Sequence, residues 1–255
     1  MRVPARVLIA SVAGSAAVVI AGCGSSTGTN GSASNTPPMG SAPASSAPAS
    51  SVPGGTRAAP TSTALVTAMQ TAVRQASSVH ISGNLASGRA PISVNLGVHR
   101  NGDVSGTVSE NGAPFHVIGI AGTIYIKATQ QFLNQINAPA SACSVVCGKW
   151  LKLTSAEASQ LTGDLNMTSL VAPLSSGKVP KLTEAGRQTV GGQAAWVLRA
   201  ADGSTLAVSS ASRHYPLAAS TGGSPHEVVM YSQWNAVPPP VSPPASQVLN
   251  ISNLK

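Results

Sequence analysis

Two closely spaced cysteines are the residues in this chain best suited to covalent chemistry. Cys143 and Cys147 are separated by three residues, and no histidine lies within twenty-five residues of either. A metal site would need further ligands. A redox-active pair is the other alternative, but the spacing is not C-x-x-C and no thioredoxin-like βαβ pattern surrounds it. We therefore predict a disulfide, formed in an oxidising compartment, that fixes the turn before Lys149.

Motifs that would support catalysis are incomplete. The five histidines lie on separate predicted strands and turns: His80, His99, His116, His214 and His226. No G-x-S-x-G elbow is present, and two S-x-x-K matches, at Ser175–Lys178 and Ser252–Lys255, lack the companion S-D-N and K-T-G motifs. Seven acidic residues leave few groups for metal or glycosidase chemistry. We predict a protein that is not an enzyme and holds neither a cofactor nor a metal.

The N-terminus resembles a bacterial lipoprotein signal peptide. Arg2 and Arg6 precede an apolar stretch, Val7–Ile20, which ends in the small pair Ala21-Gly22 and then Cys23. The resemblance implies that residues 1–22 are removed and that Cys23 carries diacylglycerol and a further acyl chain such as palmitate. At about 0.8 kcal/mol per buried CH₂, two or three chains anchor a protein stably. The alternatives are an ordinary secretory signal or a signal anchor with a chance cysteine.

A low-complexity segment follows the predicted lipidation site. Residues 23–60 consist mostly of Ser, Ala, Gly, Pro, Thr and Asn, with Arg57 as the only charged side chain. Such a composition cannot bury enough apolar surface to order itself, so we predict a disordered tether. A flexible coil of this length spans roughly 33 Å. The tether would hold residues 61–255 near the extracytoplasmic face of the cell membrane.

The charge of the predicted mature chain is modest and scattered. Without Arg2 and Arg6 it has 13 basic and 7 acidic residues, a net charge of +6. The basic residues form no run and have no interleaved aromatics, which argues against nucleic-acid binding. Attraction to anionic lipid headgroups is the use of this charge that we expect.

Periodicity predicts that residues 61–255 form one α+β domain. Apolar residues at helical spacing predict an amphipathic helix over Ala64–Ala76, capped by a residue within Thr61–Thr63. Strict alternation over Ile92–Val98 and again over Val104–Val108 predicts two strands joined at Asn101-Gly102. We expect the antiparallel meander to continue through two strands with a turn at Ala121-Gly122: Phe115–Ile120 and Thr123–Lys127.

Helices are expected in the middle of this domain and a second meander after them. Gln130–Ile136 predicts one or two turns of helix, Thr154–Glu157 matches a capping box that opens a helix toward Leu161, and Thr168–Leu174 predicts a second short helix. Five strands with short connections should follow: Lys181–Val190, Ala194–Ala200, Thr205–Ser210, Tyr215–Ser220 and Glu227–Trp234. An extended connector at Pro238–Pro240 and an edge strand within Val248–Leu254 would end the chain.

This order of elements resembles the LolA-like lipoprotein superfamily, in particular its actinobacterial lipoproteins of the LppX and LprG kind. Four phrases carry the resemblance: Ser78–Gly83, Gly122–Lys127, Gly148–Leu153 and Val190–Leu198. The resemblance implies a curved antiparallel half-barrel sheet with helices covering its concave side. It also implies an apolar cavity that takes the acyl chains of a lipid or glycolipid.

Inward-facing strand residues would form the wall of that cavity. We expect the following side chains there: Ile92, Val94, Leu96, Val117 and Ile124. A shift of one residue in register would turn all of them to the other face. The strand pattern leaves open whether the helix-covered space is a cavity or a filled core. The first case predicts a lipoprotein that presents or transfers lipid, with an envelope transporter as a further partner, and the second a structural or protein-interaction lipoprotein.

Overall fold

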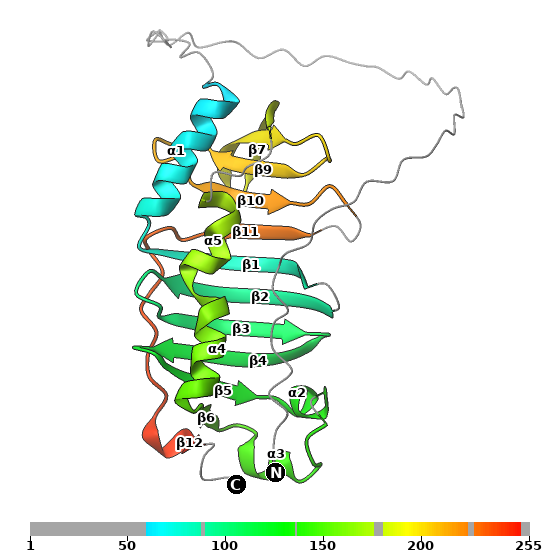
Figure 1. The fold of residues 1–255 in the computed structure, drawn as a ribbon, viewed down its shortest axis with the longest axis vertical. Coiled ribbons are helices and arrows are strands. Elements are labelled where there is room, and N and C mark those ends of the chain that lie inside the picture. Colours follow the sequence, from blue (N-terminus) through cyan, green and yellow to red (C-terminus); the bar gives the residue numbers. More distant parts are fainter. Residues whose placement is uncertain (1–59, 88–89, 136, 176–180, 224–226, 251–255) are drawn as a thin grey trace, which may run out of the picture. The chain divides into compact units, whose positions relative to one another are not determined.

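The computed structural model describes residues 60–87, 90–135, 137–175, 181–223 and 227–250 (Figure 1). All of them belong to one compact unit. The predicted signal peptide at residues 1–22, the lipidation site Cys23 and the predicted tether up to residue 59 lie outside the described residues. Those predictions therefore remain predictions.

The strands of the described chain form one sheet in the order β12-β6-β5-β4-β3-β2-β1-β11-β10-β9-β8-β7. Two meanders make up this sheet, and they meet where β1 pairs with β11. Their bounds are β1 Ser78–Ser87, β2 Ala90–His99, β3 Val104–Glu110, β4 Ala113–Ile120, β5 Thr123–Ala128, β6 Trp150–Lys152, β7 Thr183–Val190, β8 Gln193–Arg199, β9 Thr205–Ser209, β10 Pro216–Ser220, β11 Val228–Ser232 and β12 Val248–Asn250. Neighbouring strands are antiparallel, except that β12 runs parallel to β6.

Helices lie between and before the two meanders. Figure 1 shows α1, α5 and α4 running across the strands on one face of the sheet. The helices are α1 Ser62–Gln75, α2 Gln130–Gln135, α3 Ala142–Val146, α4 Ser155–Leu165 and α5 Met167–Ser175, with a 3-10 turn, η1, at Ala245–Gln247. The predicted α+β class with a mostly antiparallel sheet is confirmed. The half-barrel curvature and the covering of a concave side remain predictions.

Local sequence signals predicted most of these helices and strands. Thr61 caps α1 by accepting a hydrogen bond from the backbone N–H of Ala64 at 3.2 Å. At the start of α4 both halves of the capping box form between Thr154 and Glu157. The turns at Asn101-Gly102 and Ala121-Gly122 join consecutive antiparallel strands, as expected. Signals that satisfy backbone groups locally were therefore sufficient to locate α1, α4 and these two hairpins.

Two local details differ from the sequence expectations. The segment around Cys143 contains a short helix, α3, where only a turn was predicted. The three-residue strand β6 was not predicted, because so short a segment has no readable alternation. The C-terminal edge strand expected within Val248–Leu254 is present as β12, and it pairs parallel to β6. The segment between β11 and β12, residues 233–247, carries the chain to that edge of the sheet.

The main core lies between the sheet and the helices. Leu65, Met69 and Val73 of α1 are fully buried, and Leu161 of α4 is 1% exposed. They join one apolar cluster with buried side chains of eight strands: β1 to β5, β8, β9 and β11. Burial of one such side chain contributes about 1.5–3 kcal/mol, so this layer dominates the stability of the fold.

Arg100 holds the C-terminal end of α1 against the β2–β3 turn. Its guanidinium donates to the carbonyl oxygens of Val73, Arg74 and Ala76, with 2.7 Å from Nε to the Ala76 oxygen. These are charge-assisted hydrogen bonds to carbonyls at the negative end of the helix dipole.

We expect Arg100→Met to lower the free energy of unfolding by about 1–2 kcal/mol, because the exposed site weakens each bond. Urea denaturation measures this change. The matched control is Arg213→Met at an exposed position, where the change should stay within about 0.5 kcal/mol. Equal effects of the two substitutions would contradict this role of Arg100.

Tyr231 of β11 gives the fold a pH dependence at high pH. Burial raises the pKa of Tyr231 from 10.0 to about 12. The folded state therefore favours the neutral phenol, whereas the unfolded chain ionises near pH 10. The stabilisation is complete below pH 10 and is lost as the pH rises toward 12, by about 3 kcal/mol in total.

We expect Tyr231→Phe to flatten this alkaline loss, because phenylalanine has no proton to release. Denaturant titrations of both proteins at pH 9 and pH 11.5 measure the difference. Parallel losses of stability in the two proteins would show that other groups control the alkaline transition.

Candidate functional site

The five predicted wall residues share one face of the sheet. Val94, Leu96, Val117 and Ile124 are buried, Ile92 is half-buried, and all five belong to the cluster under the helices or pack against it. Leu96 and Val117 stand on either side of Gly106 in the ladder β2–β3–β4. All five side chains therefore lie on the helix-covered face. Their role as a lipid-binding wall stays a prediction.

These residues are packed against helices. Leu96 and Val117 have no exposed surface and Ile124 retains 1%. From the other side the same cluster receives Leu161 and Leu165 of α4 and three residues of α5: Met167, Val171 and Leu174. In the structure described, the space between the sheet and α4–α5 is occupied by side chains.

Different forces hold the helices on this face. Arg100 ties α1 to the sheet through hydrogen bonds, as described above. The side-chain hydrogen bonds described for α4 and α5 join residues of these two helices or the residues that flank them. Thr154 bonds to Glu157, and Asn166 bonds to the carbonyl of Gly163 and to Ser169. The described side chains of α4 and α5 that join the main core are apolar.

Two shallow hollows of the described chain lie on the opposite face of the sheet. One, of about 350 Å³, is bordered by His80, Asn95 and the segment Val237–Val241. The other, of about 360 Å³, is bordered by His116, Lys127 and Trp150. Both are open to solvent, and both include Ser105 and Gly106, so they adjoin across β3. No residue of α4 or α5 is among the described residues that line them.

Sequence reasoning did not identify this second face as a site. Its residues occupy the strand positions that alternate with the buried ones, for example Asn95 between Val94 and Leu96, and His116 between Phe115 and Val117. Alternation alone marks such positions as solvent-facing. The sequence does carry one signal for this face. Consecutive strands each have a polar residue other than serine at one of these solvent-facing positions.

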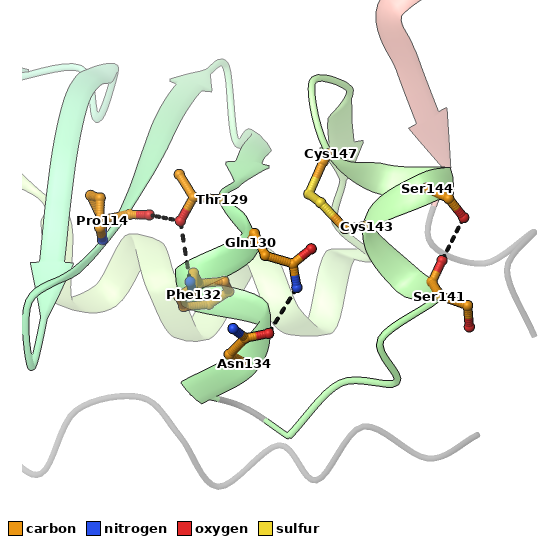
Figure 2. The surroundings of a disulfide bond; sticks show 9 residues. All are labelled: Pro114, Thr129, Gln130, Phe132, Asn134, Ser141, Cys143, Ser144 and Cys147. Carbon is orange, nitrogen blue, oxygen red and sulfur yellow. Dashed lines mark hydrogen bonds between the residues drawn. A yellow bond between two sulfur atoms is a disulfide. The ribbon is translucent and has the colours of Figure 1, made fainter.

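The predicted disulfide between Cys143 and Cys147 is present, with Cα atoms 4.7 Å apart. Figure 2 shows it closing α3 beside α2. Val146 and the half-buried cysteines pack on a small second core with Leu133 and Ala128. Thr129 joins α2 to the sheet, since its hydroxyl donates to the Pro114 carbonyl at 2.7 Å and accepts from the Phe132 N–H. The disulfide thus stabilises a small core that adjoins the main one, since Phe132 packs against both.

The histidines that the structure describes do not form a cluster. His80 bonds to Asn95 and Ser232, His116 to Thr107, and His214 to the carbonyl of Ser209. Within the described ranges, no group of three or more His, Cys, Asp or Glu side chains could hold a metal ion. His226 and most of the two S-x-x-K matches lie outside those ranges. The prediction that the protein is not an enzyme is not tested by these observations.

In the part of the chain that the structure describes, no helix is both long enough and apolar enough to cross a membrane.

Comparison with known proteins gives structural neighbours only. No family model and no curated protein matches the chain. The lipoprotein LppX of Mycobacterium tuberculosis, named above as a resembling kind, is similar at 16% identity over 71% of this chain and 98% of LppX, with a TM-score of 0.43. MucB in complex with MucA(peri) is similar at 17% identity over 72% of this chain and 60% of MucB, with a TM-score of 0.32. At these values, no activity is transferred from either neighbour.

Proposed function

We propose that this protein is an envelope lipoprotein, anchored through Cys23 on the extracytoplasmic face of the cell membrane, that binds acyl chains of a lipid or glycolipid between its sheet and α4–α5. The observation that carries this proposal is the apolar contact of the α4–α5 pair with a continuous apolar sheet face. An acyl chain offers the same kind of contact as the helix side chains. It can therefore take their place without leaving buried polar groups unpaired.

The energetics of acyl chains support such an exchange. Exposing a sixteen-carbon chain to water costs on the order of 12 kcal/mol, at about 0.8 kcal/mol per CH₂. When α4–α5 move away from the sheet, the loss of buried apolar contacts costs a free energy of the same order. The side chains that lose these contacts include Leu161, Val171 and Leu174. The ligand then offsets the cost of opening, and α4–α5 act as the movable cover of the site.

Native mass spectrometry of the full chain, purified from membranes before and after organic extraction, tests the proposal directly. An extractable extra mass beyond the covalent acyl groups is the expected result. Photo-crosslinking with a diazirine fatty acid then locates the chain, and labelled peptides should come from α4–α5 and from β2, β4 and β5. Label confined to α3 or to the strand edges would contradict the proposed position.

Anchoring is tested separately. Replacing the predicted lipidation site, Cys23→Ala, should move the protein from the membrane fraction to the soluble fraction. Cys143→Ala is the matched control, because it removes a different cysteine and should leave the protein on the membrane. If the Cys23 variant stays in the membrane fraction, the protein is held there by a signal anchor and not by a lipid anchor.

The packing of the core favours a second candidate function. Leu96 and Val117 have no exposed surface, so the space under the helices is filled in the absence of a ligand. A domain with a permanently filled core would serve as a protein-interaction lipoprotein. A clean apo mass from membranes, together with no uptake of added fatty acid, would select this function over lipid binding.

A further inference from the structure

The uncovered face of the sheet carries the two adjoining hollows, and we propose that together they form a binding groove for an anionic saccharide, a short run of sugar rings bearing carboxylate or phosphate groups. This groove lies on the opposite face from the proposed acyl site. The inference therefore does not depend on the proposed function.

The floor of the groove is a row of paired residues. Asn95 in β2 pairs with Thr107 in β3, Thr107 with His116 in β4, and His116 with Lys127 in β5. Because paired residues point to the same face, this row offers an amide, a hydroxyl, an imidazole and an ammonium side by side. These groups bond sugar hydroxyls and carboxylates, and they are aligned across four strands.

Hydrogen bonds within the groove fix the orientation of its side chains. The Asn95 Oδ1 accepts from Nε2 of His80 at 2.8 Å, which leaves the two amide N–H groups of Asn95 as donors. Thr107 Oγ1 lies 3.0 Å from Nδ1 of His116. The Nε2 of His116 makes no hydrogen bond to another described residue, and the side chain is exposed. The groove therefore presents oriented and accessible polar groups before any ligand arrives.

One end of the groove has a rigid wall made by the C-terminal strap, residues 233–241. The Asn235 N–H donates to the Ser78 carbonyl at 2.9 Å, and Nε2 of His99 donates to the Pro238 carbonyl at 3.2 Å. Val237 lies over Gly97, where an added Cβ would come within 2.6 Å of Val237 Cγ1. Three consecutive prolines, Pro238–Pro240, stiffen this wall further. The hollow beside it is thus preformed rather than a transient gap.

The other end of the groove has an aromatic ring and a cation. Lys127 Nζ lies 5.8 Å from the ring centroid of Trp150, and both side chains line the second hollow. An indole face packs against the C–H face of a sugar ring, and the ammonium pairs with a carboxylate or phosphate. No Asp or Glu is among the described residues that line either hollow. The charge of the groove therefore selects an anionic ligand over a neutral or cationic one.

A peptide strand suits this face less well. The backbone groups of β2, β3 and β4 are already paired on both sides within the sheet. Peptides that bind by strand addition require an open edge, which these central strands do not offer. Recognition on this face must come from side chains, and the side chains present are those that suit polyols and anions.

The test is binding of fluorescein-labelled hexagalacturonate to the full chain in detergent, measured by fluorescence anisotropy, with labelled maltohexaose as the neutral probe. We expect a dissociation constant below about 1 mM for the acidic probe, weakening as salt is added, and at least tenfold weaker binding of the neutral probe. Absence of binding for the acidic probe, or equal binding of both probes, would overturn the proposal.

Variants locate the binding. Lys127→Met and His116→Ala should each weaken binding by about fivefold or more, whereas Lys181→Met, an exposed lysine outside the groove, should leave it within about twofold. Circular dichroism and thermal melts confirm that each variant is folded. Displacement of the glycan by poly-glutamate at lower concentration than by unlabelled hexagalacturonate would assign the groove to an acidic protein partner instead.

Discussion

Gly106→Ala should lower the free energy of unfolding by at least about 3 kcal/mol, in urea denaturation of the full chain. Gly106 lies in β3 with a φ of +148°, a conformation that L side chains rarely adopt. An added Cβ would also collide with the carbonyl oxygen of Asn95 on the neighbouring strand. Neither strand can retreat without loss of ladder hydrogen bonds, because β3 is paired on both sides.

The matched control is a glycine with free space around it. Gly163 lies in the exposed part of α4, and an added Cβ there would meet nothing within 4 Å. Gly163→Ala should therefore raise the free energy of unfolding by about 0.5–1 kcal/mol, since alanine is the better helix former. A loss of the same size at both positions would show that the close approach of β2 and β3 is not the cause.

Leu161→Ala is the second large effect that we expect, a loss of about 2–5 kcal/mol. Leu161 is 1% exposed and lies where α4 meets the sheet, so truncation leaves a cavity lined by apolar atoms. A calorimetric melt should show a fall in Tm of roughly 5–15 °C for a domain of this size. Val145→Ala, at a side chain that is 53% exposed, should change the Tm by little.

The same variant bears on the proposed function. Leu161→Ala removes part of the apolar contact that an acyl chain must displace when α4–α5 open, so this variant should take up more added fatty acid than the natural chain. Stabilisation of the variant by fatty acid in a thermal melt is the readout. A destabilised variant whose Tm does not respond to fatty acid would favour the filled core and the protein-interaction function.

Helices and hairpins that depend on signals within a few residues could be predicted from the sequence. The helix α1 begins at a capping threonine, α4 begins at the capping box Thr154–Glu157, and the β2–β3 hairpin turns at Asn101-Gly102. Each of these signals satisfies backbone groups within a few residues. The inward facing of Ile92, Val94 and Leu96 was also predictable, because alternation in a strand with one buried face fixes it.

Long-range pairing and the filling of space required the tertiary structure. The sequence by itself determined most of the strands, the faces of their side chains, the Cys143–Cys147 pair and the apolar character of the helix-covered face. Only the fold decided that β1 pairs with β11, which joins the two meanders across 152 residues, and that α4–α5 fill the space above Leu96. It also decided that the C-terminal strap borders a groove on the other face. Alternation says which side chains share a face, whereas the volume left above that face depends on every element packed against it.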